Sequence, residues 1–295
     1  IATLSEFVVQ GSSFEMIDDK LYFYVGVNEA GSVANVLFRM NFSTESMERI
    51  SENSYTKKVI PLTEYNGQLL ALQGNILNDG IGYSFIETFT DRGEINEISL
   101  KQSNTADASN EDIFVLCIDG SGEYLYTIEK WKVGSDEKYY YIKYNKEFDF
   151  LEKVEISHLF AEYGITEALG MFYAFGNCFY IRDFSNNTIV CRLDQENVSV
   201  LLCDDVMYVE NFSGDVRYAC FRRSGTNDIY VLDTQTGEIQ IQSYDVGNDS
   251  FVIKDDAMIY GNYLLFVKKP LSEDDDREYV YLIPQNFMKK GGENE

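Results

Sequence analysis

Residues 229–238 read Ile-Tyr-Val-Leu-Asp-Thr-Gln-Thr-Gly-Glu, and this stretch decides the fold. The first four residues are apolar, β-branched or aromatic, as is typical of a strand. Asp233 follows them, and an Asp at the first position of a turn can bond the backbone two residues further on, while Gly237 gives the turn conformational freedom. Ile239 begins another short strand. The stretch therefore predicts a hairpin of two antiparallel strands.

Strands that end in Asn, Asp or Thr and run into a polar turn recur along the whole chain. They lie at 37–41, 85–90, 141–145, 190–194 and 230–233, and a sixth strand at 279–283 reaches Pro284. Their ends are about 39 to 55 residues apart. A four-stranded propeller blade repeats every 40 to 50 residues or so, which makes the repeat typical of a propeller.

A second recurring pattern is a tight turn followed by an apolar or aromatic strand. Its copies lie at 18–24, 66–72, 120–126, 176–181, 213–218 and 261–266. Gly and Asn in several of these turns tolerate the positive φ that short hairpins require. The two patterns alternate, so each repeat contains four strands; in the fifth repeat we expect them at 206–210, 216–221, 229–233 and 238–242.

These repeats predict an all-β chain folded as a six-bladed β-propeller with four-stranded antiparallel blades. Seven blades is the alternative if one long connection contains a degenerate unit. The last repeat lacks an outer strand, because the residues after Ile283 are poor strand formers. We therefore expect residues 6–10, Glu-Phe-Val-Val-Gln, to supply that strand and close the ring. One domain would cover residues 1–287, followed by a disordered tail at 288–295.

The stretch at 229–238 resembles the hairpin between the third and fourth strands of quinoprotein-like and TolB-like propellers. The count of six blades resembles the TolB-like and YWTD-like group, including propellers of bacterial surface proteins. The Trp of quinoprotein repeats is absent here, and no Tyr-Trp-Thr-Asp sequence occurs. The resemblance implies a fold and very little function.

Composition excludes several classes of partner. The 295 residues carry a net charge of −25, with 49 acidic against 24 basic side chains. Such a surface repels nucleic acids and anionic membranes, so we expect neither as a partner. No apolar run is long enough to span a membrane. We expect a monomer.

The chain begins at Ile1, which we interpret as the result of removing a secretory or lipoprotein signal. The expected location is extracellular or on the cell surface, and a cytoplasmic location stays open. Five cysteines are an odd number, and we expect small buried side chains, with a disulfide left open.

Basic residues are scarce, yet they gather where the second strands of the third to sixth repeats end. In a propeller these ends share one face, so they could form a patch for an anionic glycan or polymer. The alternative is ion pairing with surrounding carboxylates. Two aromatic residues, Trp131 and Tyr55, are expected on loops of this face, where they could stack on sugar rings. The candidate ligand-binding residues are Lys130, Trp131, Lys132, Arg182, Arg222, Arg223, Lys268 and Lys269.

Catalytic and metal-binding signatures are weak. His158 is the only histidine, it lies in a connection expected to contain a helical turn, and no G-x-S-x-G elbow accompanies it. The acidic run at 272–278 lacks the spacing of a calcium loop, so we expect no cofactor, and structural calcium is weakly supported. We assign no catalytic residue. The sequence therefore predicts a non-catalytic propeller that binds a ligand or protein; a carboxylate-dependent carbohydrate enzyme and a protein-binding assembly subunit are the alternatives.

Overall fold

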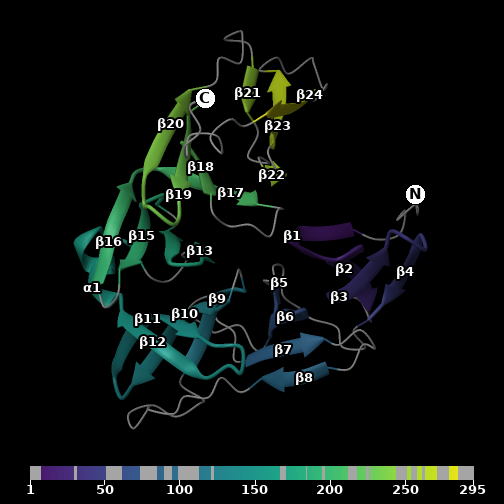
Figure 1. Ribbon diagram of the computed structural model, residues 1–295, viewed down its shortest axis with the longest axis horizontal. Coiled ribbons are helices and arrows are strands. Elements are labelled where there is room, and N and C mark those ends of the chain that lie inside the picture. Colours follow the sequence, from purple (N-terminus) through teal and green to yellow (C-terminus); the bar gives the residue numbers. More distant parts are fainter. Residues whose placement is uncertain are drawn as a thin grey trace, which may run out of the picture.

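The computed structural model is built almost entirely of antiparallel strands, arranged as successive sheets around a common centre (Figure 1). Its only helix in the described part of the chain is α1 (Ser157–Glu162). The structure describes residues 8–29, 32–50, 62–73, 85–89, 95–98, 113–120, 123–166, 171–183, 185–194, 197–211, 218–223, 226, 228–243, 251–253, 258–260, 263–270 and 279–284.

The first two sheets each contain four strands in chain order. The first comprises β1 (Val8–Ile17), β2 (Lys20–Glu29), β3 (Ser32–Asn41) and β4 (Ser46–Arg49). The second comprises β5 (Leu62–Tyr65), β6 (Gln68–Gln73), β7 (Phe85–Phe89) and β8 (Ile95–Ile98). Between β5 and β6, Asn66 and Gly67 both have positive φ, of 54° and 74°, as the predicted two-residue turn requires.

The third and fourth sheets repeat this order. The third comprises β9 (Ile113–Asp119), β10 (Leu125–Val133), β11 (Asp136–Tyr144) and β12 (Phe150–Glu155). The fourth comprises β13 (Met171–Phe175), β14 (Cys178–Arg182), β15 (Thr188–Asp194) and β16 (Asn197–Cys203). Helix α1 lies in the connection between them, where the sequence predicted a helical turn.

The last two units are joined into one larger sheet. They comprise β17 (Val206–Asn211), β18 (Tyr218–Arg223), β19 (Asp228–Asp233), β20 (Ile239–Ser243), β21 (Phe251–Ile253), β22 (Met258–Tyr260), β23 (Tyr263–Pro270) and β24 (Tyr279–Pro284). A short parallel pairing of β17 with β22 connects the two units. Strands β21 and β22 both pair with β23, and β24 pairs with its other edge.

The hairpin predicted at 229–238 is confirmed. The Asp233 carboxylate accepts the backbone N–H of Gln235 at 2.9 Å, and the Asp233 carbonyl accepts the N–H of Gly237 at 2.7 Å. Gly237 has a φ of 77°. The same bond recurs where the Asn145 side chain accepts the N–H of Glu147, two residues on, at 3.0 Å. Asx side chains therefore form the turns after both strands.

The N-terminal strand does not lie where the closure prediction placed it. Val8 and Val9 belong to β1 and pair with Gly26 and Val25 of β2, beyond a break in register between Val9 and Phe14. Residues 6 and 7 lie outside the described part. A hairpin with the adjacent β2 closes a shorter loop than pairing with the other end of the chain, and it therefore costs less entropy.

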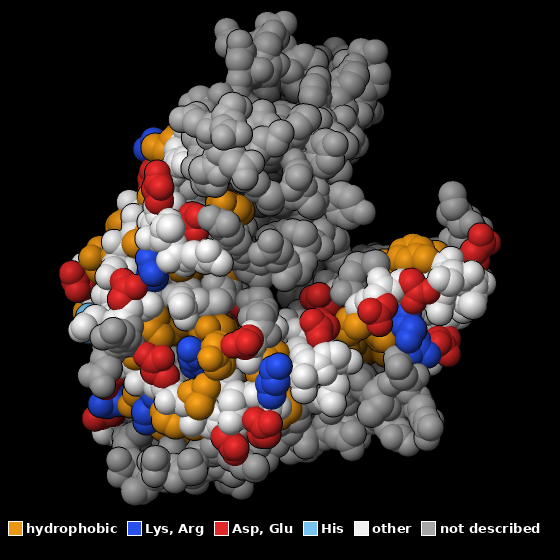
Figure 2. All heavy atoms as spheres, in the orientation of Figure 1, with side chains coloured by type: hydrophobic (Ala, Val, Ile, Leu, Met, Phe, Trp, Pro, Cys, Tyr) orange, Lys and Arg blue, Asp and Glu red, His pale blue; other side chains and the backbone are white. Residues whose placement is uncertain are grey.

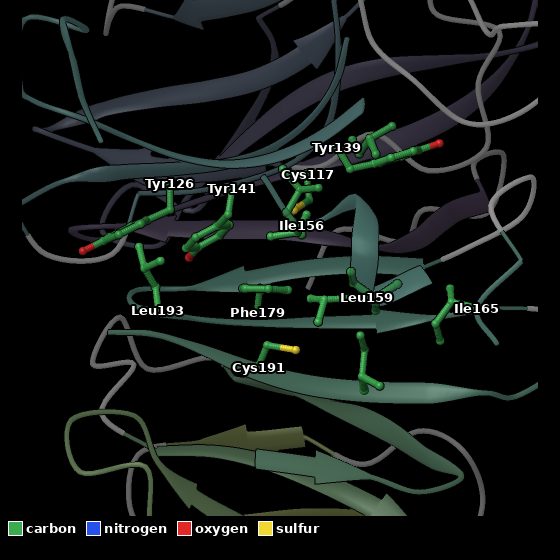
Figure 3. Close-up of a cluster of buried hydrophobic side chains, with 14 residues drawn as sticks. Cys117, Tyr126, Tyr139, Tyr141, Ile156, Leu159, Ile165, Phe179, Cys191 and Leu193 are labelled. Atoms are coloured by element: carbon green, nitrogen blue, oxygen red, sulfur yellow. The ribbon is translucent and has the colours of Figure 1, made fainter. Parts of the chain in front are cut away.

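Neighbouring sheets pack face to face through apolar side chains. Between the third and fourth sheets, Tyr126, Ile128 and Tyr141 meet Phe179 and Cys191 in one buried cluster (Figure 3). A second cluster joins Tyr65 and Leu70 of the second sheet to the opposite face of the third sheet. A third joins the fourth and fifth units. The third and fourth sheets are therefore packed on both faces, and the connections between their strands lie at the sheet edges.

Candidate functional site

The connection between β16 and β17 lies beside the ends of two strands that carry predicted site residues. Arg182 is the last residue of β14, and Arg223 is the last residue of β18. Arg182 Nη2 lies 3.3 Å from Asp205 Oδ1, and Arg223 Nε lies 3.2 Å from Asp204 Oδ2. The structure thus brings together two of the predicted basic residues on one edge, with acidic residues between them.

Further hydrogen bonds hold this connection in place. The Tyr230 hydroxyl donates to Asp204 Oδ2 at 3.0 Å, and the buried Tyr180 hydroxyl donates to the Val206 carbonyl at 2.9 Å. Arg182 also donates to Asn186 Oδ1, at 2.5 Å, in the turn that follows β14. We call residues 182–183, 185–187, 204–206 and 223 the clamped rim. Its loops are ordered by side chains from both adjoining sheets.

Lys130 and Lys132 of β10 share a single carboxylate. Lys130 Nζ lies 2.7 Å and Lys132 Nζ 3.5 Å from Glu137 on β11. On the face that Figure 2 shows, Lys and Arg side chains lie among Asp and Glu side chains. The contacts of Lys130, Lys132, Arg182 and Arg223 are ion pairs with neighbouring carboxylates, as the alternative to a ligand-binding patch predicts.

Trp131 does not lie on a loop, so its expected stacking position was wrong. It lies within β10, and only 5% of its surface is exposed. The ring is covered by Lys153, whose Nζ is 4.2 Å from the ring centroid. Alternation along a strand places Trp131 on the opposite face from Lys130 and Lys132. Tyr55 lies outside the described residues.

The remaining predicted site residues are less informative. Arg222 is buried, with 7% of its surface exposed. Lys268 and Lys269 lie in β23, for which the structure describes only the backbone pairing. The acidic run at 272–278 and the tail at 288–295 lie outside the described residues.

Sequence reasoning missed two buried carboxylates. Glu129 is fully buried in β10, and it accepts hydrogen bonds from Thr127, Trp131 and Tyr144. Burial is the largest influence on its pKa, which lies above the usual value despite these hydrogen bonds. The spacing of Thr127, Glu129 and Trp131 was the available signal, because alternate strand residues share a face.

Asp183, directly after Arg182, is the second buried carboxylate. It accepts two hydrogen bonds from Thr166 and two from Asn187. Burial opposes its ionisation, but these hydrogen bonds outweigh burial and lower its pKa. Asp183 therefore stabilises the turn that begins the clamped rim.

The other chemical candidates are isolated in the part of the chain that the structure describes. His158 is exposed on α1. No group of three or more metal-ligating side chains occurs among the described residues. All five cysteines are free thiols, and only Cys203 is exposed; burial raises the pKa of Cys178 to about 12. In the same described residues, no helix is long and apolar enough to cross a bilayer.

Comparisons with known proteins identify a fold. No family model and no curated protein matches the chain. Among solved structures, an acylaminoacyl peptidase from Pyrococcus horikoshii is similar with a TM-score of 0.56 and 10% identity, over 95% of this chain and 45% of that one. The chain thus spans less than half the length of that enzyme.

The β-propeller domain of the Trilobed protease from Pyrococcus furiosus, described as having an open velcro topology, is similar with a TM-score of 0.54 and 9% identity. That match covers 95% of this chain and 83% of the propeller domain. Identities this low carry information on architecture alone. The chain is an all-β protein with the fold of a β-propeller.

Proposed function

We propose that this chain is a non-catalytic, single-domain propeller of six blades, which binds a ligand or protein partner on the clamped rim. Four sheets of four strands, and an eight-stranded sheet that holds the strands of two more units, support the blade count. The proposal includes the expected extracellular or cell-surface location and a monomeric state.

The order of the clamped rim is the observation that carries this proposal. Asp204 and Asp205 are held by Arg223 and Arg182 from two neighbouring units. Ordering a loop before binding reduces the entropy that binding must overcome, and loops on a rigid scaffold commonly carry binding functions.

The buried carboxylates support a non-catalytic role. Glu129 accepts three hydrogen bonds and Asp183 accepts four, all from neighbouring protein groups. A general acid or base must instead reach the substrate. Both carboxylates are therefore bonded within the scaffold and do not reach a substrate.

An anionic glycan or polymer is the ligand class we propose for the rim. The Arg223 side chain is 45% exposed, although it is paired with Asp204. Ion pairs at such exposure contribute little, about 0–1 kcal/mol, so a carboxylate or sulfate of a ligand could replace Asp204. Arg182 is more deeply buried and would keep its role of holding the loop.

A thermal-shift screen tests the proposal, with neutral glycans, acidic glycans, anionic polymers and calcium, each with an EDTA control. A ligand that binds only the folded state raises Tm as its concentration exceeds its Kd. We expect a shift with acidic glycans or anionic polymers that Arg223→Glu abolishes. Arg49→Glu, the same change on the exposed β4, should leave the shift unchanged.

A shift that survives Arg223→Glu would place the ligand elsewhere. Equal loss in both variants would indicate only general electrostatic attraction. The absence of any shift across the panel would remove small anionic ligands from the proposal, and a protein partner would have to be tested instead.

A further inference from the structure

Glu129 lies in the packed interface between the second and third sheets. Its strand neighbours are Val115 of β9 and Tyr140 of β11, and the pairing of β10 with β9 shifts register next to it. Leu125 and Trp131, on the same face of β10, pack with Tyr65 of the second sheet. A fully buried carboxylic acid therefore occupies a position where the surrounding side chains are mainly apolar or aromatic.

The hydrogen bonds to Glu129 come from neutral groups. Thr127 Oγ1 and Tyr144 Oη donate to Oε1 at 2.9 and 2.7 Å, and Trp131 Nε1 donates to Oε2 at 2.8 Å. Neutral donors stabilise a carboxylate, but they do not supply the opposite charge that a buried ion requires. Burial therefore opposes the ionised form of Glu129, while these three hydrogen bonds favour it.

We infer that Glu129 is a proton-controlled switch, whose ionisation changes the packing of Trp131 and of the β10 end between the second and third sheets. Trp131 connects Glu129 to the end of β10. Its indole N–H donates a hydrogen bond to Glu129, and in the sequence it lies between Lys130 and Lys132. The switch goes beyond the proposed binding role, and it can be tested without any ligand.

Four other titratable side chains lie around Glu129. Tyr144 and Tyr140 face it from β11, Tyr65 lies in the same cluster from β5, and Lys153 reaches it from β12 through the face of Trp131. Burial raises the pKa of Tyr144 and of Tyr65, so both stay neutral through the acidic and neutral range. The positive charge of Lys153 lowers the pKa of Glu129, against the larger effect of burial.

The direction of the effect follows from linkage. Burial holds the pKa of Glu129 above its usual value, so the folded protein binds this proton more tightly than the unfolded chain does. Glu129 therefore contributes stability in acid. That contribution is lost as pH rises from about 4.3, the ordinary value for Glu, through the higher pKa of the folded state. The interface loosens toward neutral pH.

The single tryptophan of the chain makes the switch directly observable. We expect a pH titration of Trp131 fluorescence to show one transition with a midpoint above about 4.3. Far-UV circular dichroism should stay constant across it, which shows that the chain remains folded. Glu129→Gln should abolish the transition. Glu152→Gln, which removes a carboxylate from β12 of the same sheet, should retain it.

Tyr144→Phe provides a second test that does not remove the carboxylate. It deletes one hydrogen bond to the ionised form, so the midpoint should move to higher pH. If Glu129→Gln does not fold, Tyr144→Phe still tests whether Glu129 is the group that titrates. The inference is overturned by a transition that persists in Glu129→Gln, by a midpoint unchanged in Tyr144→Phe, or by constant fluorescence while the wild-type chain stays folded.

Discussion

At the scale of single residues, Gly120 shows how closely the second and third sheets approach. A Cβ at this position would lie 2.2 Å from the Glu64 carbonyl oxygen and 2.8 Å from Tyr65 Cβ. Its N–H also donates to Thr63 Oγ1 at 2.9 Å. We expect Gly120→Asn to lower the free energy of unfolding by about 1–3 kcal/mol, measured by urea denaturation, because backbone atoms cannot move aside easily.

Gly67→Asn is the matched control. Gly67 has a φ of 74°, and a Cβ added there would meet no atom within 4 Å. Asn also tolerates this left-handed conformation. Gly67→Asn should therefore lower the free energy of unfolding much less than Gly120→Asn does. Equal costs at the two positions would show that close approach is not the reason for Gly120.

Asp183 gives a pH-dependent prediction at the same scale. Burial opposes its ionisation, but the hydrogen bonds from Thr166 and Asn187 lower its pKa below the usual value. The stability it contributes is present above the ordinary Asp pKa of about 3.9, and it is lost as pH falls through the lower pKa of the folded state. Asp183→Ala should cost roughly 1–3 kcal/mol at pH 7, because buried donors lose their acceptor.

The difference between Asp183→Ala and wild type should narrow below about pH 4, measured by urea denaturation at each pH. Asp149→Ala is a suitable control, since this residue also lies in a turn but on another sheet. A difference that stayed constant down to the acid unfolding of the wild type would contradict the role of the ionised form.

At the scale of elements, the connection between β16 and β17 is held by two buried tyrosines whose hydrogen-bond acceptors differ in exposure. Tyr180 is 1% exposed and donates to the Val206 carbonyl, while Tyr230 donates to the carboxylate of Asp204. Tyr180→Phe should cost about 1–3 kcal/mol, because it removes a hydrogen bond from a buried carbonyl. Tyr230→Phe should cost less, since water can reach Asp204. Similar losses of unfolding free energy in urea would contradict this ranking.

At the scale of the whole molecule, the net charge of −25 opposes compaction. Salt should therefore stabilise the chain, because the Debye length falls from about 30 Å at 0.01 M to about 8 Å at 0.15 M. We expect Tm to rise over this range and then to level off, as measured by differential scanning calorimetry in sodium chloride. A Tm that stayed flat, or that rose only above 0.15 M, would contradict self-repulsion as the cause.

Local chemistry made most of the architecture predictable. The strands that end at Asn41, Asp194 and Asp233 were placed correctly. At Asn41 and Asp233 the reason is that the Asx side chain bonds its own turn and needs no distant partner. The four strands of the fifth unit were likewise placed to within two residues, with the hairpin stretch at 229–238 as the guide.

The candidate site was only partly predictable. The ends of β14 and β18 were expected to share an edge, and the structure places Arg182 and Arg223 on either side of Asp204 and Asp205. Ion pairing with carboxylates was the alternative interpretation, but the sequence could not show that Asp204 and Asp205 are the partners, because this depends on how neighbouring units pack. Alternation along the strand places Glu129 and Trp131 on one face, but only the structure shows that this face is buried.

The sequence by itself determined most of the strands, the turns that follow them and the net negative charge of the chain. These properties depend on residues within a few positions of one another or on composition alone. Only the tertiary structure decided that both ends of β1 pair with β2, that Glu129 is buried, and which carboxylate neutralises which base. Those outcomes depend on contacts between sheets, where burial and loop entropy choose among partners that the local sequence leaves equivalent.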